Sequence, residues 1–149
     1  MAETLCRLIP TDLSAEITKE RAESAVEYLK EQFGTNDVVY VIAHTPMFVE
    51  CGDMLHYVGC PHCQKQLPFR WWAEEMARCA ETGFTKRSVT FPCCKKSGLL
   101  EDIEYREPCG LAKIVFEARE PAFPLDSESL NTLRLILGCD LRVIQAHYS

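Results

Sequence analysis

Three segments of the chain repeat apolar residues every three or four positions, as the buried face of a helix does. They cover residues 18–33, 68–80 and 126–137. Pro68 stands at a favoured first helical position, and Asp126 or Ser127 is a good N-cap for the third segment. Each segment is followed by a glycine that can end the helix: Gly34, Gly83 and Gly138. The pattern therefore predicts three helices.

Other segments have the composition of β-strands. The run 38–43 is apolar throughout and rich in β-branched residues, which predicts a strand buried on both faces. Residues 103–106 and 111–119 alternate around a turn-forming segment, which predicts a β-hairpin. Further strands are expected at residues 47–50, 54–58, 88–91 and 141–148. Strands that neighbour one another, with helices between them, predict a single α+β domain over residues 1–149, with a mixed, mainly antiparallel sheet.

Composition and charge narrow the possible functions. No apolar run approaches the length that spans a bilayer, and the first residues contain no basic stretch followed by an apolar one. We therefore expect a cytoplasmic protein without a membrane partner. The formal net charge is −6, and the 16 Lys and Arg residues are scattered, whereas nucleic-acid binders cluster a surplus of cations. An acidic surface instead suits a basic protein partner.

Nine cysteines are the most informative feature of the composition. Their number is odd and no export signal is visible, so reduced thiols are expected rather than disulfides. Cys60-Pro61-His62-Cys63 forms a C-x-x-C motif, and Cys93-Cys94 follows after 29 intervening residues. Both motifs follow predicted strands. Four thiolates brought together from two such turns form a tetrahedral zinc site. The two motifs resemble the paired knuckles of zinc ribbons, which implies a structural Zn²⁺ bound by Cys60, Cys63, Cys93 and Cys94.

The second motif departs from the zinc-ribbon pattern. It should read C-x-x-C, but Phe91 stands where its first cysteine belongs, and Lys96 and Ser97 stand where a later one would be. The fourth ligand therefore stays open at this point, with three substitutes in the sequence: Cys79, His62 and His56. A redox dithiol and a set of unliganded cysteines are the alternatives to a metal site.

The remaining cysteines are interpreted as structural. Cys6, Cys51 and Cys139 lie in or beside apolar segments and are expected to be small buried residues. Cys79 lies beside the apolar stripe of the second predicted helix. Cys109 lies in the predicted turn, where it can be exposed and should matter little for stability.

Catalytic motifs are missing from the sequence. It contains no H-E-x-x-H, no G-x-S-x-G and no phosphate-binding glycine loop, and no histidine supplies the H-x-E of zinc deaminases. A metal with four cysteine ligands has no position for water, which favours a structural role. We therefore assign no catalytic residue. A Cys–His pair that meets only in the folded chain stays open.

Trp71 is the candidate for a partner-binding surface. The predicted buried stripe of the second helix consists of Phe69, Trp72, Ala73, Met76, Ala77 and Ala80. Trp71 falls outside this stripe, so it is either covered by another part of the chain or available to a partner. Glu74, Glu75 and Glu81 lie near it. Trp71, Glu74 and Glu75 are therefore predicted to bind a partner.

Together these features predict a non-catalytic, zinc-stabilised binding protein. In its size, its acidity and its cysteine layout the chain resembles small bacterial immunity-type proteins, which neutralise toxins by occluding them. This resemblance implies a toxin as the protein partner. Two alternatives come from other classes: a thiol- or metal-dependent enzyme, and a zinc-ribbon regulator that binds nucleic acid. The charge balance counts against the second alternative.

Overall fold

A computed structural model describes residues 2–52 and 55–149. Within these residues it contains three α-helices and an antiparallel sheet of four strands, which confirms the α+β prediction. None of the helices in this part of the chain is long and apolar enough to cross a membrane. The elements, in chain order, are β1 (Glu3–Pro10), α1 (Lys19–Phe33), β2 (Val38–Val49), β3 (Val58–Gly59), α2 (Phe69–Ala80), β4 (Ser88–Thr90), β5 (Ser97–Leu99), the 3-10 turn η1 (Leu100–Asp102), β6 (Glu104–Tyr105), β7 (Gly110–Arg119), α3 (Ser127–Leu137) and β8 (Leu141–Tyr148).

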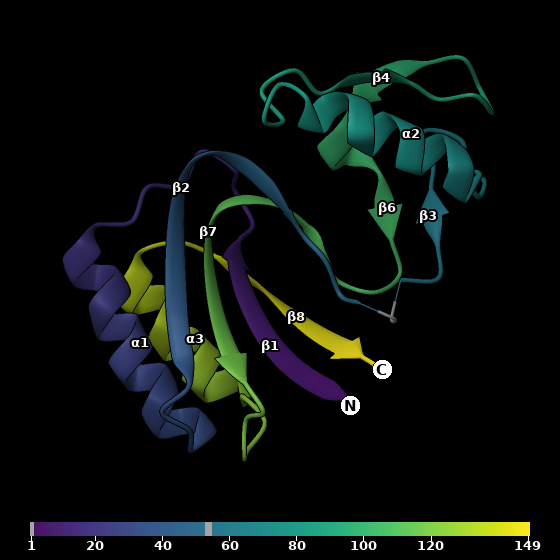
Figure 1. The fold of residues 1–149 in the computed structure, drawn as a ribbon. Helices are drawn as coiled ribbons and strands as arrows, with labels where there is room; N and C mark the ends of the chain where they lie inside the picture. Colours follow the sequence, from purple (N-terminus) through teal and green to yellow (C-terminus); the bar gives the residue numbers. More distant parts are fainter. Residues whose placement is uncertain (1, 53–54) are drawn as a thin grey trace.

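The four-stranded sheet has the order β2-β7-β1-β8, and α1 and α3 lie side by side on one of its faces (Figure 1). β1 and β2 both run antiparallel to β7, so β1-α1-β2 is a split βαβ unit. β7-α3-β8 is a second such unit around β1. This is ferredoxin-like connectivity, here with a long insertion between β2 and β7. Such an arrangement occurs with many functions, so the function must be argued from local chemistry.

Capping residues mark the boundaries of α1 and α3; the caps Gly34, Asp126 and Gly138 were predicted, whereas the cap at Thr18 was not. The hydroxyl of Thr18 accepts from the backbone N–H of Arg21 at the start of α1, and the carboxylate of Asp126 accepts from the N–H of Ser129 at the start of α3. Gly34 and Gly138 end the two helices in the left-handed conformation that favours glycine, with φ of 64° and 72°. Local sequence therefore marks where both helices begin and end.

The largest hydrophobic cluster lies between the two helices and the sheet. Alternating residues of each strand face the helices, which bury Phe116 and Leu29 almost completely. The buried members of this cluster are Cys6, Leu8, Ile17, Ala22, Ala25, Val26, Leu29, Phe33, Val38, Ile114, Phe116, Ala118, Leu133, Leu137 and Leu141.

The predicted burial of both faces of residues 38–43 is wrong. The segment is the start of β2, an outer strand of the sheet, and only its helix-facing side is covered. Val39, Val41 and Ile42 are 52%, 49% and 47% exposed. Apolar content alone does not distinguish a central strand from an edge strand.

The predicted hairpin of residues 103–106 and 111–119 is also wrong. Both segments contain strands, but β6 pairs with β3, and β7 pairs with β1 and β2. β1, which the sequence pattern did not predict, occupies a central place between β7 and β8. Of the strand expected at residues 54–58, Val58 belongs to β3, and Met54 lies outside the described residues.

Residues 58–105, here called the knuckle insert, pack around a second hydrophobic cluster. Its buried members are Val58, Cys60, Leu67, Cys79, Val89, Phe91, Leu100 and Ile103. Aromatic side chains join the insert to the sheet. The ring of Phe48 on β2 lies 5.7 Å from that of Trp72 on α2 and 6.0 Å from that of Tyr105 on β6, and the indole N–H of Trp72 donates to the Tyr105 hydroxyl at 3.0 Å.

The expected buried stripe of α2 is correct only in part. Trp72 and Met76 are half-buried against the insert, but Phe69 is exposed, as are the alanines at 73, 77 and 80. The fully buried residue of α2 is Cys79. The helix is therefore rotated toward Trp71, whose ring lies 5.9 Å from that of Phe91, so the fold itself covers part of Trp71.

Candidate metal centre

The first cysteine turn is closed by two backbone hydrogen bonds. The N–H of Cys60 donates to the carbonyl of Lys65 at 2.9 Å, and the N–H of Gln64 donates to the carbonyl of Cys60 at 3.1 Å. Gln64 takes the left-handed conformation, with φ of 65°. The turn directly follows β3, whose pairing with β6 fixes its start.

The second turn repeats this pattern. The N–H of Phe91 donates to the carbonyl of Lys96 at 2.9 Å, and the N–H of Lys95 donates to the carbonyl of Phe91 at 2.8 Å. Lys95 is left-handed, with φ of 62°. Residues 60–65 and 91–96 are therefore two copies of one turn, and the second follows β4, which pairs with β5.

This equivalence explains the irregular spacing of the second motif. Cys63 and Cys94 are counterparts, but Phe91 stands at the position of Cys60, and Cys93 stands at the position of His62. The second turn thus supplies its other thiol from its third residue. The two hexapeptides, C-P-H-C-Q-K and F-P-C-C-K-K, share proline, cysteine and lysine at the second, fourth and sixth positions. That repeat was a usable sequence signal for the equivalence.

The two turns bring the four predicted ligands together. The Sγ atoms of Cys60, Cys63, Cys93 and Cys94 all lie within 4.8 Å of one another. The Sγ of Cys60 is 3.7 Å from that of Cys94, and the Sγ of Cys63 is 3.1 Å from that of Cys93. A tetrahedral ion with bonds of about 2.3 Å to sulfur separates its ligands by about 3.8 Å. The cluster therefore fits one four-coordinate metal ion with small side-chain movements.

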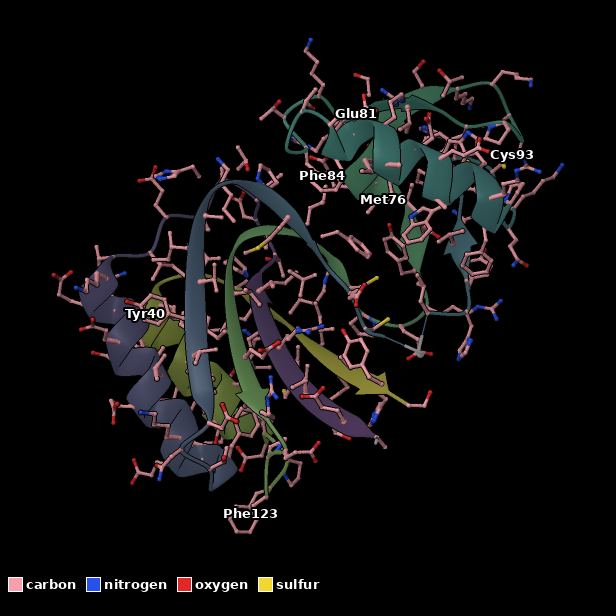
Figure 2. All side chains as sticks on the ribbon, viewed as in Figure 1. Tyr40, Met76, Glu81, Phe84, Cys93 and Phe123 are labelled. Carbon is pink, nitrogen blue, oxygen red and sulfur yellow. The ribbon has the colours of Figure 1, made fainter. Side chains whose placement is uncertain are left out.

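The surroundings of the cluster are those of a partly covered site. Cys60 is buried, while the other three cysteines are half-buried. The backbone N–H of His62 points at the Sγ of Cys60 at 3.4 Å, a contact that favours a thiolate. Figure 2 shows Cys93 at the end of the knuckle insert that lies far from Tyr40 and the four-stranded sheet.

The thiols of Cys60 and Cys93 have pKa values that are shifted in opposite directions. Burial raises the pKa of Cys60, but backbone N–H groups of Cys63 and His62 and the neighbouring thiols outweigh it and lower that pKa to about 6. The pKa of Cys93 is raised to about 12 by its hydrogen bond with Cys63, by burial and by the negative charge of Cys60. A negative charge on Cys60 therefore opposes ionisation of Cys93, and a bound cation would offset that repulsion.

Cys93 and Cys94 both belong to the group of four cysteines, and none of the three candidate substitutes does. Cys79 is buried in the hydrophobic cluster of the insert. His62 is exposed, and its ring packs against that of Phe91 at 5.4 Å. His56 is exposed and lies outside the group of four.

The residues predicted to bind a partner lie on α2. Trp71 is half-buried, as described above. The carboxylate of Glu74 pairs with Arg70 at 3.3 Å, and that of Glu75 pairs with Arg78 at 2.9 Å. These cations reduce the negative potential that the two glutamates present to solvent. A partner-binding role for the three residues stays a prediction.

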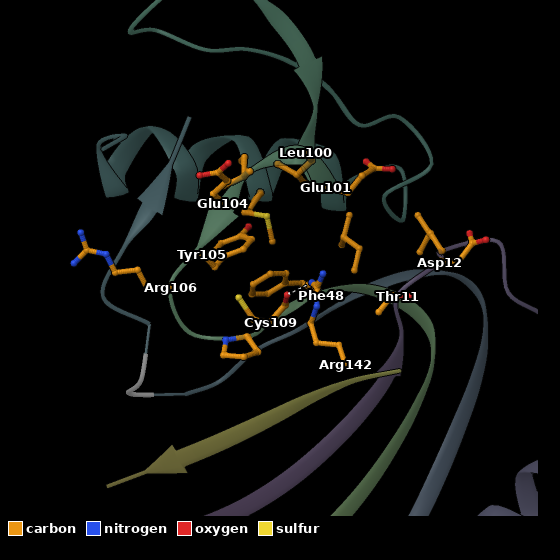
Figure 3. Close-up of a pocket in the computed structure, with 16 residues that line it drawn as sticks. Thr11, Asp12, Phe48, Leu100, Glu101, Glu104, Tyr105, Arg106, Cys109 and Arg142 are labelled. Carbon is orange, nitrogen blue, oxygen red and sulfur yellow. Dashed lines mark hydrogen bonds between the residues drawn. The ribbon is translucent and has the colours of Figure 1, made fainter. Parts of the chain in front are cut away.

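A cleft of about 900 Å³ separates the knuckle insert from the near end of the sheet (Figure 3). Cys109 lines it, but the expectation of an exposed Cys109 is wrong, because the residue is 1% exposed. Burial raises the pKa of its thiol, so it stays protonated. Arg142 donates to the Cys109 carbonyl at 2.8 Å and thus fixes the backbone there. This cysteine has the environment of a structural residue.

No protein-family model, curated protein or solved structure matches this chain.

Proposed function

We propose that Cys60, Cys63, Cys93 and Cys94 bind one structural zinc ion that stabilises the knuckle insert of a non-catalytic binding protein. The observation behind this proposal is the convergence of four sulfur atoms, from two turns of equal backbone geometry, within 4.8 Å. Zinc is the metal that tetrahedral sulfur sites of this kind most often hold. Four protein ligands leave no position for water or substrate, so the ion serves the fold and not a reaction.

A redox role for Cys60 and Cys63 has less support. Redox dithiols of the thioredoxin kind lie at a helix N-terminus, where the helix dipole lowers the thiol pKa. Here α2 begins only at Phe69, after an intervening segment. The insert also has a small hydrophobic cluster, and polypeptides of that size commonly need a metal or another cross-link to stay folded.

The test is metal analysis of reduced protein purified without added metal. We expect one zinc per chain, and less than about 0.2 equivalents of any metal would contradict a tight structural site. Cys63→Ser should lose the metal. Cys139→Ser is the matched control, since Cys139 is also half-buried but lies outside the cluster. Equal metal content in the two variants would show that the cluster is not the site.

The binding partner proposed for this protein is basic. The knuckle insert contains seven Lys or Arg against six Asp or Glu, whereas the rest of the chain contains nine against sixteen. The insert therefore carries +1 and the remainder −7. The acidic surface belongs to the helix–sheet part, where the exposed side of α1 presents four glutamates: Glu20, Glu23, Glu27 and Glu31. Glu23 and Glu27 pair with Lys19 and Lys30, so Glu20 and Glu31 contribute most to its negative potential. Opposite charge on a partner would speed association with that part.

A toxin is the specific partner that the size, acidity and cysteine layout favour, and a reducing compartment such as the cytoplasm suits the free thiols. A pull-down from the native host at low and at high salt tests this, with mass spectrometry to identify what is retained. We expect a basic protein that high salt releases. Turnover of a substrate by the pure protein, together with no retained protein, would refute the binding role. If Trp71 is part of the interface, Trp71→Ala should speed dissociation of that partner.

A further inference from the structure

The outer edge of β2 is unusually apolar. Of the seven large apolar side chains that are exposed in the described part of the chain, three lie within four consecutive positions: Val39, Val41 and Ile42. From 38 to 49 the strand contains no Asp, Glu, Lys or Arg. Its backbone pairs on one side with β7, and the sheet ends on its other side.

The opposite edge of the same sheet is protected. β8 exposes Arg142, Gln145 and His147 among its apolar residues. The C-terminal end of β8 is also covered, because the N–H of His147 donates to the carbonyl of Cys51 and Gly52 forms a β-bridge with His147. Natural sheets guard their edges with charges or with covering segments, since an unguarded edge pairs with another strand. β2 has a proline, Pro46, and a register irregularity between Ile42 and Met47, which also guard edges, but residues 38–42 precede both and contain no charge.

We propose that β2 pairs with β2 of a second copy of this chain in antiparallel orientation, so that two four-stranded sheets become one of eight strands. Strand alternation fixes which registers are possible. Val38 and Tyr40 face the helices, so Val39 and Val41 face the open side. A twofold axis normal to the sheet at Tyr40 places the helix-facing sides of both copies on one face of the joined sheet and their open sides on the other. It sets Val39 opposite Val41 of the second copy, and Val38 opposite Ile42.

This register is self-complementary because it extends apolar rows that already cross the sheet. On the helix-facing side Tyr40 lies beside Phe116, with 6.1 Å between ring centroids. The twofold axis places Tyr40 of the second copy next to Tyr40 of the first, so the row continues with the second copy's Tyr40 and then its Phe116. On the open side Val41 lies beside Val115, and the row continues into Val39 of the second copy. β-Branched and aromatic pairs of this kind stabilise neighbouring strands, and no charged side chain meets another across the new seam.

The salt dependence separates this interface from the proposed basic partner. Each copy carries −6, so two copies repel one another while their strands pair through backbone and apolar contacts. Added salt screens that repulsion and should strengthen the dimer. It should weaken attraction to a basic protein. The dimer proposal can therefore be refuted without refuting the function proposed above, and the reverse is also true.

The experiment is sedimentation equilibrium of the full-length, metal-loaded protein over about 1 to 200 µM, a range that resolves a micromolar dissociation constant. We expect the mass to rise from 17.0 kDa toward twice that value, and to do so at lower concentration in high salt. Val41→Lys should raise the dissociation constant at least about tenfold, because a lysine on the edge opposes strand pairing.

Gln145→Lys is the matched control, because it places the same charge at an exposed position of the protected edge and should leave the dimer unchanged. Circular dichroism establishes that both variants fold. A monomer at every concentration and salt, or an equal effect of the two substitutions, would overturn the proposal. If the chain is monomeric throughout but binds another protein through an extended segment of that protein, the edge of β2 belongs to a different partner and the proposal is wrong. Amide exchange of residues 38–42 should also slow with protein concentration.

Discussion

The two cysteine turns each place a residue with a side chain in the left-handed conformation, and glycine should improve both. Gln64 has φ of 65° and Lys95 has φ of 62°. In this region the Cβ atom crowds the following carbonyl, whereas glycine has no Cβ. We therefore predict that Gln64→Gly and Lys95→Gly each stabilise the metal-loaded protein.

The magnitude follows from two opposed contributions. Relief of the left-handed conformation favours the folded state by about 1–2 kcal/mol. Glycine also gives the unfolded chain more freedom, which costs about 0.5–1 kcal/mol. The net gain is therefore about 0–1.5 kcal/mol for each turn, and about 0.75 kcal/mol at the midpoints of the two ranges. In a chain of 149 residues this raises the melting temperature by about 2–4 °C per kcal/mol.

Differential scanning calorimetry of the zinc-loaded variants measures the effect. Lys65→Gly and Lys96→Gly are the matched controls, because each changes the next residue of the same turn, outside the left-handed region. They should lose about 0.5–1 kcal/mol, since there glycine only adds unfolded-state freedom. If Gln64→Gly and Lys65→Gly shift the melting temperature in the same direction by the same amount, the backbone argument is wrong.

Three further predictions concern other positions. Cys63→Ser should lose both metal and stability. Cys109→Ser should keep the metal but lower the free energy of unfolding by about 1–3 kcal/mol, because a hydroxyl replaces a buried thiol. Metal analysis together with thermal unfolding distinguishes the two variants. Asp126→Ala should lower the melting temperature at pH 7 and progressively less as pH falls below 4, since the capping hydrogen bonds that lower the pKa of Asp126 act only on its ionised form. Gly52→Ala should destabilise by about 1–3 kcal/mol in urea unfolding, because Gly52 has φ of 64° and its new Cβ would strike the carbonyl of His147.

The helices were predictable because their determinants are local. Thr18, Asp126 and the glycines at 34 and 138 act within one turn of the helix end that they cap. The apolar spacing of α1 and α3 matched the cluster that they bury. Strand β8 was predicted with its observed bounds, since a periodic segment followed the last helix. These inferences need no knowledge of what packs against the segment.

The sheet was less predictable because strand partners are distant in sequence. β1 pairs with β7 and β8, more than 100 residues away, and its pattern of burial, with Leu8 and Ile9 both covered, follows from contacts on both faces. The hairpin prediction failed for a related reason. A turn-forming segment at residues 107–110 connects two strands of different sheets.

The convergence of the four cysteines was predictable, but the symmetry of their two turns was not. Cys-x-x-Cys and an adjacent cysteine pair, each after a strand, were enough to name the four residues that cluster. What they left open was the place of Phe91. Phe91 stands at the position of Cys60 in the repeated turn, and its ring packs against that of Trp71. The residue that departs from the zinc-ribbon pattern is therefore also the one that covers the tryptophan. That link between two separate predictions appears only in three dimensions.

The metal and the edge strand should act as separate features of this fold. Within the described residues, the cluster beneath α1 and α3 and the cluster of the knuckle insert have no member in common. Several apolar contacts join the two parts: Phe48 contacts Trp72 and Tyr105, and its strand neighbour Leu111 packs against the cluster of the insert. These contacts lie at the far end of β2 from Val39 and Val41. If the proposed metal is bound, its removal withdraws binding energy that is linked to folding of the insert, and the sheet would sense that loss through those contacts. The start of β2 is held by Val38 and Tyr40 against the helices. Strand pairing at that edge should therefore survive metal removal, even where the insert does not stay folded.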